Sequence, residues 1–290
     1  MMSLFVQVLI SGLAIGAIYA LIAAGFSLLS QGSQTVNFAQ GDFVVVPAFV
    51  MLAANSYGLP IWASFIVALV VAALVLGVLF KRLMVDPILP HGAMQLSIAT
   101  MALSIVLQNG MLNAGGAQAF PFPGINGGLH FGGVFIDWQS VTILLTAVAA
   151  VTALNLFMGR TRIGRAIQAS AQGPQVARLL GINVARMVLI TFVLNAALVT
   201  LAALLVSPIY LVKFNNGIGI GLAAFSAAII GGFNQVRGAV VGGLLLGVVQ
   251  NFAATFGPTQ YRDAVPMLLL IIFILFRPQG LLGRAEERRV

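Results

Sequence analysis

The sequence predicts an all-α polytopic membrane protein with eight or nine transmembrane helices. Of its 290 residues, 60% are hydrophobic and only 7% are charged. The apolar residues form repeated runs of about 20 residues, the length that an α-helix needs to cross a bilayer core. A transmembrane barrel would instead show short segments of alternating hydrophobicity. These observations exclude a soluble domain.

The first two apolar runs, 5–29 and 36–54, carry the first candidate features. The first run is too long for a signal peptide and lacks a basic leader, so we expect a retained span. Its Gly12 and Gly16 have the four-residue spacing that lets helix backbones approach closely in lipid. Asp42 stands near the start of the second run, where it either faces a cavity or partner at membrane depth or lies at the interface near a helix start.

A polar stripe marks the fourth run, 93–112, which follows the run 60–80 and an expected loop at 86–92. Ser104 and Gln108 are four residues apart and share a helix face. Such a stripe fits two roles, lining a translocation path or hydrogen-bonding to neighbouring helices. The residues expected along a path are Asn37, Gln40, Asp42, Ser104, Gln108, Asn109 and Gln250.

The segment 113–137 is a long loop without basic residues, which fits the exterior, and Trp138 then marks the membrane boundary. His91 and His130 are isolated loop residues without metal-ligand spacing, so we expect no metal site. The run 141–158 follows.

The longest polar island is 159–186, which holds five arginines and no acid. We expect a helix over 162–170, with Ile163, Ala166, Ile167 and Ser170 on one apolar stripe. Gly173 and Pro174 then break it, because proline favours the first turn of a new helix.

The second short helix of the island places Val176, Leu179 and Leu180 on one face and stops at Gly181, which suits a left-handed C-terminal residue. Two interpretations of the island remain open. It is a surface helix pair on anionic headgroups, or it is a docking element for a soluble partner.

The last third holds the spans 187–206, 217–231, 238–251 and 264–276, and the second of these or the run 36–54 is short enough to be re-entrant. Four glycines at small-xxx-small spacing predict close helix packing. Together with the first-span pair, the helix-packing residues are Gly12, Gly16, Gly238, Gly242, Gly243 and Gly247.

Basic residues decide the orientation. With the island and the C-terminus in the cytoplasm, 12 of the 14 lysines and arginines lie inside and only Lys213 and Arg262 lie outside. The net charge of +8 is therefore topogenic, and we expect no nucleic-acid partner.

Several chemistries are missing from the sequence. It has no phosphate-binding Gly-x-x-x-x-Gly-Lys-Ser/Thr loop, no paired carboxylates and no nucleophile with a partner histidine and acid, so we expect no catalytic site and no cofactor. The membrane interior is also poor in acids, which disfavours an ion-coupled carrier. A solute would then be moved by energy supplied from outside this chain.

An ordered set of motifs resembles the permease subunits of branched-chain amino-acid ABC importers, in particular the shorter H-type permease. The motifs are 12–27 (GLAIGAIYALIAAGFS), 37–42 (NFAQGD), 103–109 (LSIVLQN), 164–169 (GRAIQA), 177–183 (ARLLGIN), 238–247 (GAVVGGLLLG) and 277–283 (RPQGLLG). Together they cover nearly the whole chain.

The resemblance implies an ABC importer permease fold: one transmembrane permease domain, 1–290, with a cytoplasmic coupling segment at 159–186, in the bacterial inner membrane. It implies a second permease, two cytoplasmic ATPases and an extracytoplasmic binding protein as partners. The solute would be a branched-chain amino acid or a related small solute such as urea, an amide or another amino acid. The ATPase-coupling residues would be Ile163, Gly164, Arg165, Ala166, Ala169, Ala177, Arg178, Leu180 and Gly181.

The alternative function is a self-sufficient channel or an ion-coupled secondary transporter that uses Asp42.

Overall fold

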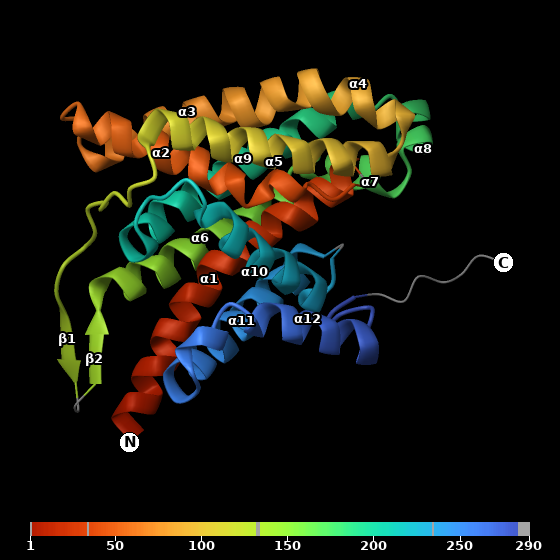
Figure 1. Cartoon of the computed structure of the whole chain (residues 1–290). Coiled ribbons are helices and arrows are strands. Elements are labelled where there is room, and N and C mark those ends of the chain that lie inside the picture. The colour runs from red at the N-terminus through yellow and green to blue at the C-terminus, as the bar shows by residue number, and fades with distance from the viewer. Residues whose placement is uncertain (1, 34, 132–133, 234, 284–290) are drawn as a thin grey trace. The chain divides into compact units, whose positions relative to one another are not determined.

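The computed structural model describes residues 2–33, 35–131, 134–233 and 235–283 (Figure 1). The chain divides into two compact units. Unit 1 contains Met1–Ser27, Ile125–Ala149 and Leu222–Val290, and unit 2 contains Leu28–Gly124 and Ala150–Gly221.

The first helices match the predicted runs. Helix α1 spans Met2–Ser33, the short 3-10 helix η1 spans Phe38–Gln40, and α2 spans Asp42–Ser56. Helix α1 is longer than its apolar run, 5–29, whereas α2 begins six residues after the start of the run 36–54, because η1 occupies part of that run. Within unit 2, α2 contacts α3 (Ile61–Ala72), α5 (Ala93–Gly115) and α9 (Val184–Tyr210).

The predicted loop at 86–92 was wrong, because the chain stays helical to His91. Helix α3 continues through the π-helical segments η2 (Ala73–Leu79) and η3 (Lys81–Val85) into α4 (Asp86–Ile88) and the 3-10 turn η4 (Leu89–His91). Pro87 stands in the first turn of α4, where its missing N–H is not needed. The Asp86 N–H bonds to the Lys81 carbonyl, and their side chains form an ion pair of 2.9 Å.

The long loop at 113–137 was also predicted incompletely. Its second half forms an antiparallel hairpin of β1 (Gly128–Phe131) and β2 (Val134–Asp137), in which Leu129 pairs with Ile136 and His130 with Phe135. His130 therefore lies in a strand, with its ring 4.7 Å from that of Phe135. Leu129 and Phe131 alternate in β1 and Val134, Phe135 and Ile136 form a short β-prone run in β2, but the surrounding glycines and prolines obscured this signal.

The second half of the chain follows the predicted order. The remaining elements are α6 (Trp138–Arg160), α7 (Arg162–Gln172), α8 (Pro174–Leu179), α10 (Asn216–Gly231), α11 (Val236–Phe256), η5 (Thr259–Tyr261) and α12 (Val265–Phe276). In the part of the chain that the structure describes, seven helices are long and apolar enough to cross a membrane, and α10 and α12 are shorter apolar helices. The expected eight or nine spans agree with this set.

Unit 1 is organised around α11, whose glycines meet other backbones directly. A Cβ on Gly16 would lie 2.9 Å from the Leu244 Cα, and one on Gly243 would lie 2.6 Å from the Ala20 Cα. Side chains do not approach backbone atoms that closely, so only glycine permits this α1–α11 contact. A buried cluster of Tyr19, Ala223, Ile230 and Leu246 lies beside it.

The same helix contacts α10 through Gly238 and Gly242, where an added Cβ would collide with the backbone around Gly231. The segment after α12 closes this contact, since Leu281 and Leu282 donate backbone hydrogen bonds to the carbonyls of Ile230 and Gly231 at 2.8 and 3.0 Å.

Unit 2 has a core of side chains. The rings of Phe43, Phe80 and Phe192 form a continuous series, with centroids 5.0 and 5.6 Å apart, and join α2 and α9 to the rod of α3 to η4. This core holds α2 in place and thereby positions the polar residues at its N-terminus.

Candidate functional site

A buried polar cluster surrounds Asp42, the first residue of α2. Its side chain is only 3% exposed. Ser104 Oγ and Gln108 Nε2 both donate to Asp42 Oδ2, the latter over 3.3 Å, and Gln108 Nε2 also donates to Ser104 Oγ over 3.0 Å. The sequence placed the last two on one face of α5, and the tertiary structure directs that face at the acid.

The start of α10 lies against the same acid. A Cβ on Gly217 would lie 2.8 Å from the Asp42 Cα, and one on Gly221 would lie 2.8 Å from the Gly41 Cα. Two helix N-termini, those of α2 and α10, therefore flank the carboxylate, and their partial positive charge favours an acid there. Asp42 Oδ1 is buried without a hydrogen-bond partner among the described residues.

A second buried pair joins η1 to α9. Gln40 Nε2 donates to Asn195 Oδ1 over 2.7 Å, and Asn195 Nδ2 donates back to Gln40 Oε1 over 3.1 Å. Both side chains are fully buried. Asn37 caps η1, since its Oδ1 accepts from the Ala39 N–H at 3.1 Å.

Two predicted path residues do not join these groups. Asn109 is exposed and donates to the Ile105 carbonyl of its own helix at 2.8 Å. Gln250 belongs to unit 1, where it is buried and donates to the Arg262 carbonyl at 3.2 Å. Among the seven predicted residues, the acid, Ser104 and Gln108 form one connected cluster.

Sequence reasoning missed Asn195 and Gly217 as site residues. Asn195 is the one amide in the apolar run 187–206, which was a usable signal for a buried polar contact. Gly217 carried no local signal, because its role depends on the approach of α2, which is far away in the sequence.

The basic segment forms the two expected short helices. Thr161 caps α7, its Oγ1 accepting from the Gly164 N–H at 2.9 Å. The buried residues of α7 are Gly164, Ile167 and Ser170. A Cβ on Gly164 would collide with the Met158 backbone, so this glycine seats α7 on the end of α6.

The face that α7 buries within unit 2 differs at one position from the apolar stripe of its sequence. Ile163 is 44% exposed, whereas Gly164 occupies the buried face instead. The buried face is displaced by one residue because the close contact with α6 requires glycine, which a hydrophobicity pattern does not register.

Helix α8 exposes most of its apolar face. Pro174 occupies its first turn, and Ala177 is buried. Gly181 ends the segment with φ +79°. Val176, Leu179 and Leu180 are 61%, 87% and 74% exposed. These side chains lack a partner within unit 2 and are available to another protein or to lipid.

No metal-binding group is evident in the described residues, where no three His, Asp or Glu side chains cluster. The geometry offers buried hydrogen-bonding groups in the membrane-spanning part and an exposed basic helix pair outside it. Such an arrangement suits solute passage and protein contact.

Comparisons with known proteins agree with this geometry. The family model described as branched-chain amino acid transport system / permease component matches residues 8–274. The high-affinity branched-chain amino acid transport system permease protein BraD of Pseudomonas aeruginosa is 34% identical over 99% of this chain and 98% of its own. LivH of Escherichia coli, a permease protein of the same description, is 32% identical over the same shares.

A solved structure supports the fold alone. PsaBC from Streptococcus pneumoniae in complex with Fab aligns with 96% of this chain and 97% of its own at a TM-score of 0.53 and 14% identity. The chain is thus a multi-pass inner-membrane transport protein, with seven long apolar helices among the described residues. It belongs to the family of permease components of branched-chain amino acid transport systems.

Proposed function

We propose that this chain forms one membrane half of an ATP-driven importer for branched-chain amino acids or a related small solute such as urea or an amide. The observation that carries the proposal is the full-length similarity to two permeases named for high-affinity branched-chain amino acid transport. The alternative, a self-sufficient channel or ion-coupled carrier using Asp42, is not favoured by this similarity.

The proposed partners are a second permease, identical or different, two cytoplasmic ABC ATPases and an extracytoplasmic solute-binding protein. The sequence supports separate ATPases because it has no phosphate-binding loop of its own. Residues 1–290 would act as a single transmembrane permease domain, with the C-terminus in the cytoplasm.

The coupling segment, 159–186, would be the surface that contacts the ATPases. Its exposed members, Ile163, Arg165, Arg178 and Leu180, are the direct contacts in this proposal. Its buried members would position the helices: Gly164 seats α7, and Ala177 faces the rest of unit 2. Ala166 and Ala169 are half-buried between these groups.

The path would run past the cluster around Asp42. Asn37, Gln40 and Gln108 contribute amides to this part of unit 2, and their hydrogen bonds support a role in holding α2, α5 and α9 in fixed register. Closely packed glycines would keep α11 rigid while the path opens.

Reconstitution tests the proposal. The complex is assembled in liposomes from this chain, its second permease, the ATPases and the binding protein, and leucine uptake is measured with ATP. We expect Arg165→Glu and Gly164→Glu to reduce uptake at least about tenfold while membrane insertion is retained, because each disturbs the coupling segment.

A matched control is Arg82→Glu, which reverses the charge of an exposed arginine outside the coupling segment and should leave most uptake intact. Leucine flux through the purified chain alone, without any ATPase, would overturn the proposal in favour of the channel or carrier.

A further inference from the structure

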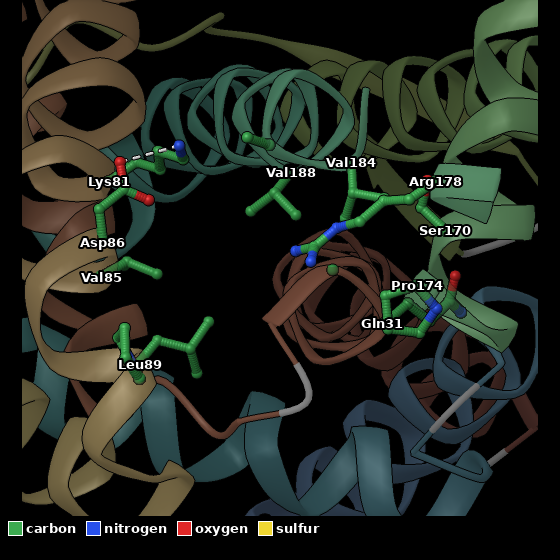
Figure 2. Close-up of a pocket in the computed structure, with 13 residues that line it drawn as sticks. Gln31, Lys81, Val85, Asp86, Leu89, Ser170, Pro174, Arg178, Val184 and Val188 are labelled. Atoms are coloured by element: carbon green, nitrogen blue, oxygen red, sulfur yellow. Dashed lines mark hydrogen bonds and ion pairs between the residues drawn. The ribbon is translucent and has the colours of Figure 1, made fainter. Parts of the chain in front are cut away.

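A pocket of about 400 Å³ lies entirely within unit 2, away from the cluster around Asp42. The end of α1, the segments η3 to η4, the helices α7 and α8 and the start of α9 all contribute to its wall. This volume is within the range of small-molecule sites in proteins. Figure 2 shows the side chains around it.

Arg178 supplies the pocket with an unpaired positive charge. Its guanidinium has no ion pair or side-chain hydrogen bond to another described residue. In Figure 2 it extends from α8 over the pocket, toward Val188 and away from its own helix. A guanidinium in this position is suited to a two-pronged hydrogen bond with a carboxylate.

Asp86 supplies a negative charge on another wall. Its Oδ2 accepts the Lys81 ammonium at 2.9 Å, and the side chains of Lys81 and Asp86 are 9% and 47% exposed. Figure 2 shows the other carboxylate oxygen of Asp86 turned away from Lys81. This oxygen can accept a further hydrogen bond from a cationic group.

The wall between the two charges is aliphatic. Val85, Leu89 and Val188 line the pocket there. Their side chains would bury an aliphatic group of similar size, which contributes favourably in proportion to the apolar area removed from water.

We propose that this pocket binds a free amino acid with an aliphatic side chain. Its α-carboxylate would pair with Arg178, its α-ammonium with Asp86, and its side chain would lie against Val85, Leu89 and Val188. The inference rests on the proposed function, since the ligand is the class of solute that the importer carries. An occupant would join α8 to the rod of α3 to η4 and so restrain the coupling segment.

The acid distinguishes this ligand from an anionic lipid. A phosphate headgroup can pair with Arg178, but it offers no hydrogen-bond donor to the free oxygen of Asp86, whose charge Lys81 already offsets in large part. A zwitterion uses both charges. The Lys81–Asp86 pair keeps the acid in place without cancelling its remaining acceptor capacity.

Binding of radiolabelled leucine to the purified full chain tests the inference. We expect Arg178→Gln and Asp86→Asn each to weaken binding roughly tenfold, the cost of a lost charged hydrogen bond. Val188→Phe fills the pocket without changing a charge and should also abolish binding. Arg186→Gln, in the same basic segment but outside the pocket, should bind as the unmodified chain does.

Ligand analogues divide the two charge contacts. Leucinol lacks the carboxylate, and 4-methyl-2-oxopentanoate lacks the ammonium, so each should bind more weakly than leucine. In Asp86→Asn the oxo acid should bind as well as leucine, because the partner of the ammonium is gone.

Leucine binding that is unchanged in the pocket variants would overturn the inference. A competition measurement with phosphatidylglycerol vesicles could also overturn it. If the vesicles displace leucine from the unmodified chain but not from Arg178→Gln, the pocket is a lipid site. ATP-driven leucine uptake by the complex carrying Val188→Phe is measured in parallel. If uptake is normal and leucine binding does not depend on the pocket residues, the pocket proposal is rejected and the proposed function stands. If the unmodified complex shows no ATP-driven uptake, the proposed function is rejected.

Discussion

The α1–α11 contact of unit 1 and the Asp42 cluster of unit 2 hold membrane helices together in opposite ways. In the middle of the α1–α11 contact, Gly16, Gly243 and Gly247 bring backbones into direct contact, and side chains join the two helices only toward the start of α1, where Asn251 donates to Ser11 Oγ over 2.8 Å. Around Asp42, buried side chains from α2 and α5 form the contact by hydrogen bonding.

The difference shows how lipid changes the packing problem. Hydrocarbon solvates apolar side chains as well as a protein core does, so burying them gives little gain, and helices associate through close packing and polar contacts. The glycine contact depends on shape and tolerates no added atom. The polar cluster depends on chemistry and should tolerate changes that keep its hydrogen bonds.

The largest expected effect is at the glycine contact. Gly247→Ala would place a Cβ on the Gly16 backbone, so α1 and α11 must move apart. We expect a loss of about 3 kcal/mol or more in the free energy of unfolding, measured in mixed detergent micelles. Stability equal to that of the unmodified chain would show that these helices do not meet as described.

A smaller effect is expected at the acid. Asp42→Ala removes the acceptor of Ser104 and Gln108 and should cost about 1–3 kcal/mol, because two half-buried donors lose this partner. The same unfolding assay checks it. Asn109→Ala is the matched control, since this neighbouring amide is exposed and bonds only to its own helix. Equal losses in the two variants would contradict the cluster.

A third test measures the buried amide pair. Gln40→Leu, Asn195→Leu and the double variant form a mutant cycle, whose coupling energy should be about 0.6 kcal/mol, as for other hydrogen bonds between membrane helices. If the effects of the two substitutions on stability are additive, the hydrogen bonds between these two side chains contribute nothing to stability.

An effect of similar size is expected at Gly110, which lies in α5 with nothing within 4 Å of an added Cβ. Gly110→Ala should stabilise the isolated chain by about 0.5–1 kcal/mol through helix propensity alone. Since the substitution is the same as at Gly247, opposite signs would establish that backbone contact decides the outcome. A destabilising result would indicate an unseen neighbour at α5.

Local patterns predicted the basic segment well. Pro174 and Gly181 lie at a first turn and a left-handed end, as predicted, and each of these roles depends on only a few neighbouring residues. The loop expected at 86–92 is helical instead, because the π-helical segment continues into α4 and Pro87 stands in the first turn of α4, where its missing N–H is not needed.

The partners of the polar residues were beyond local patterns. Gln40 and Asn195 are 155 positions apart, so no periodicity relates them. The burial of Gly164 and the exposure of Ile163 were also beyond local patterns, because they depend on where the end of α6 lies.

The sequence by itself determined that this chain crosses the membrane repeatedly, which helices it forms and that a basic segment lies between two spans. These features follow from runs of apolar residues and from caps, which act over one or two turns. Only the tertiary structure decided that Ser104 and Gln108 face Asp42, that Gly217 makes room for it, and that Arg178 and Asp86 share a pocket. Such contacts join segments far apart in the chain, and their geometry depends on how whole helices pack.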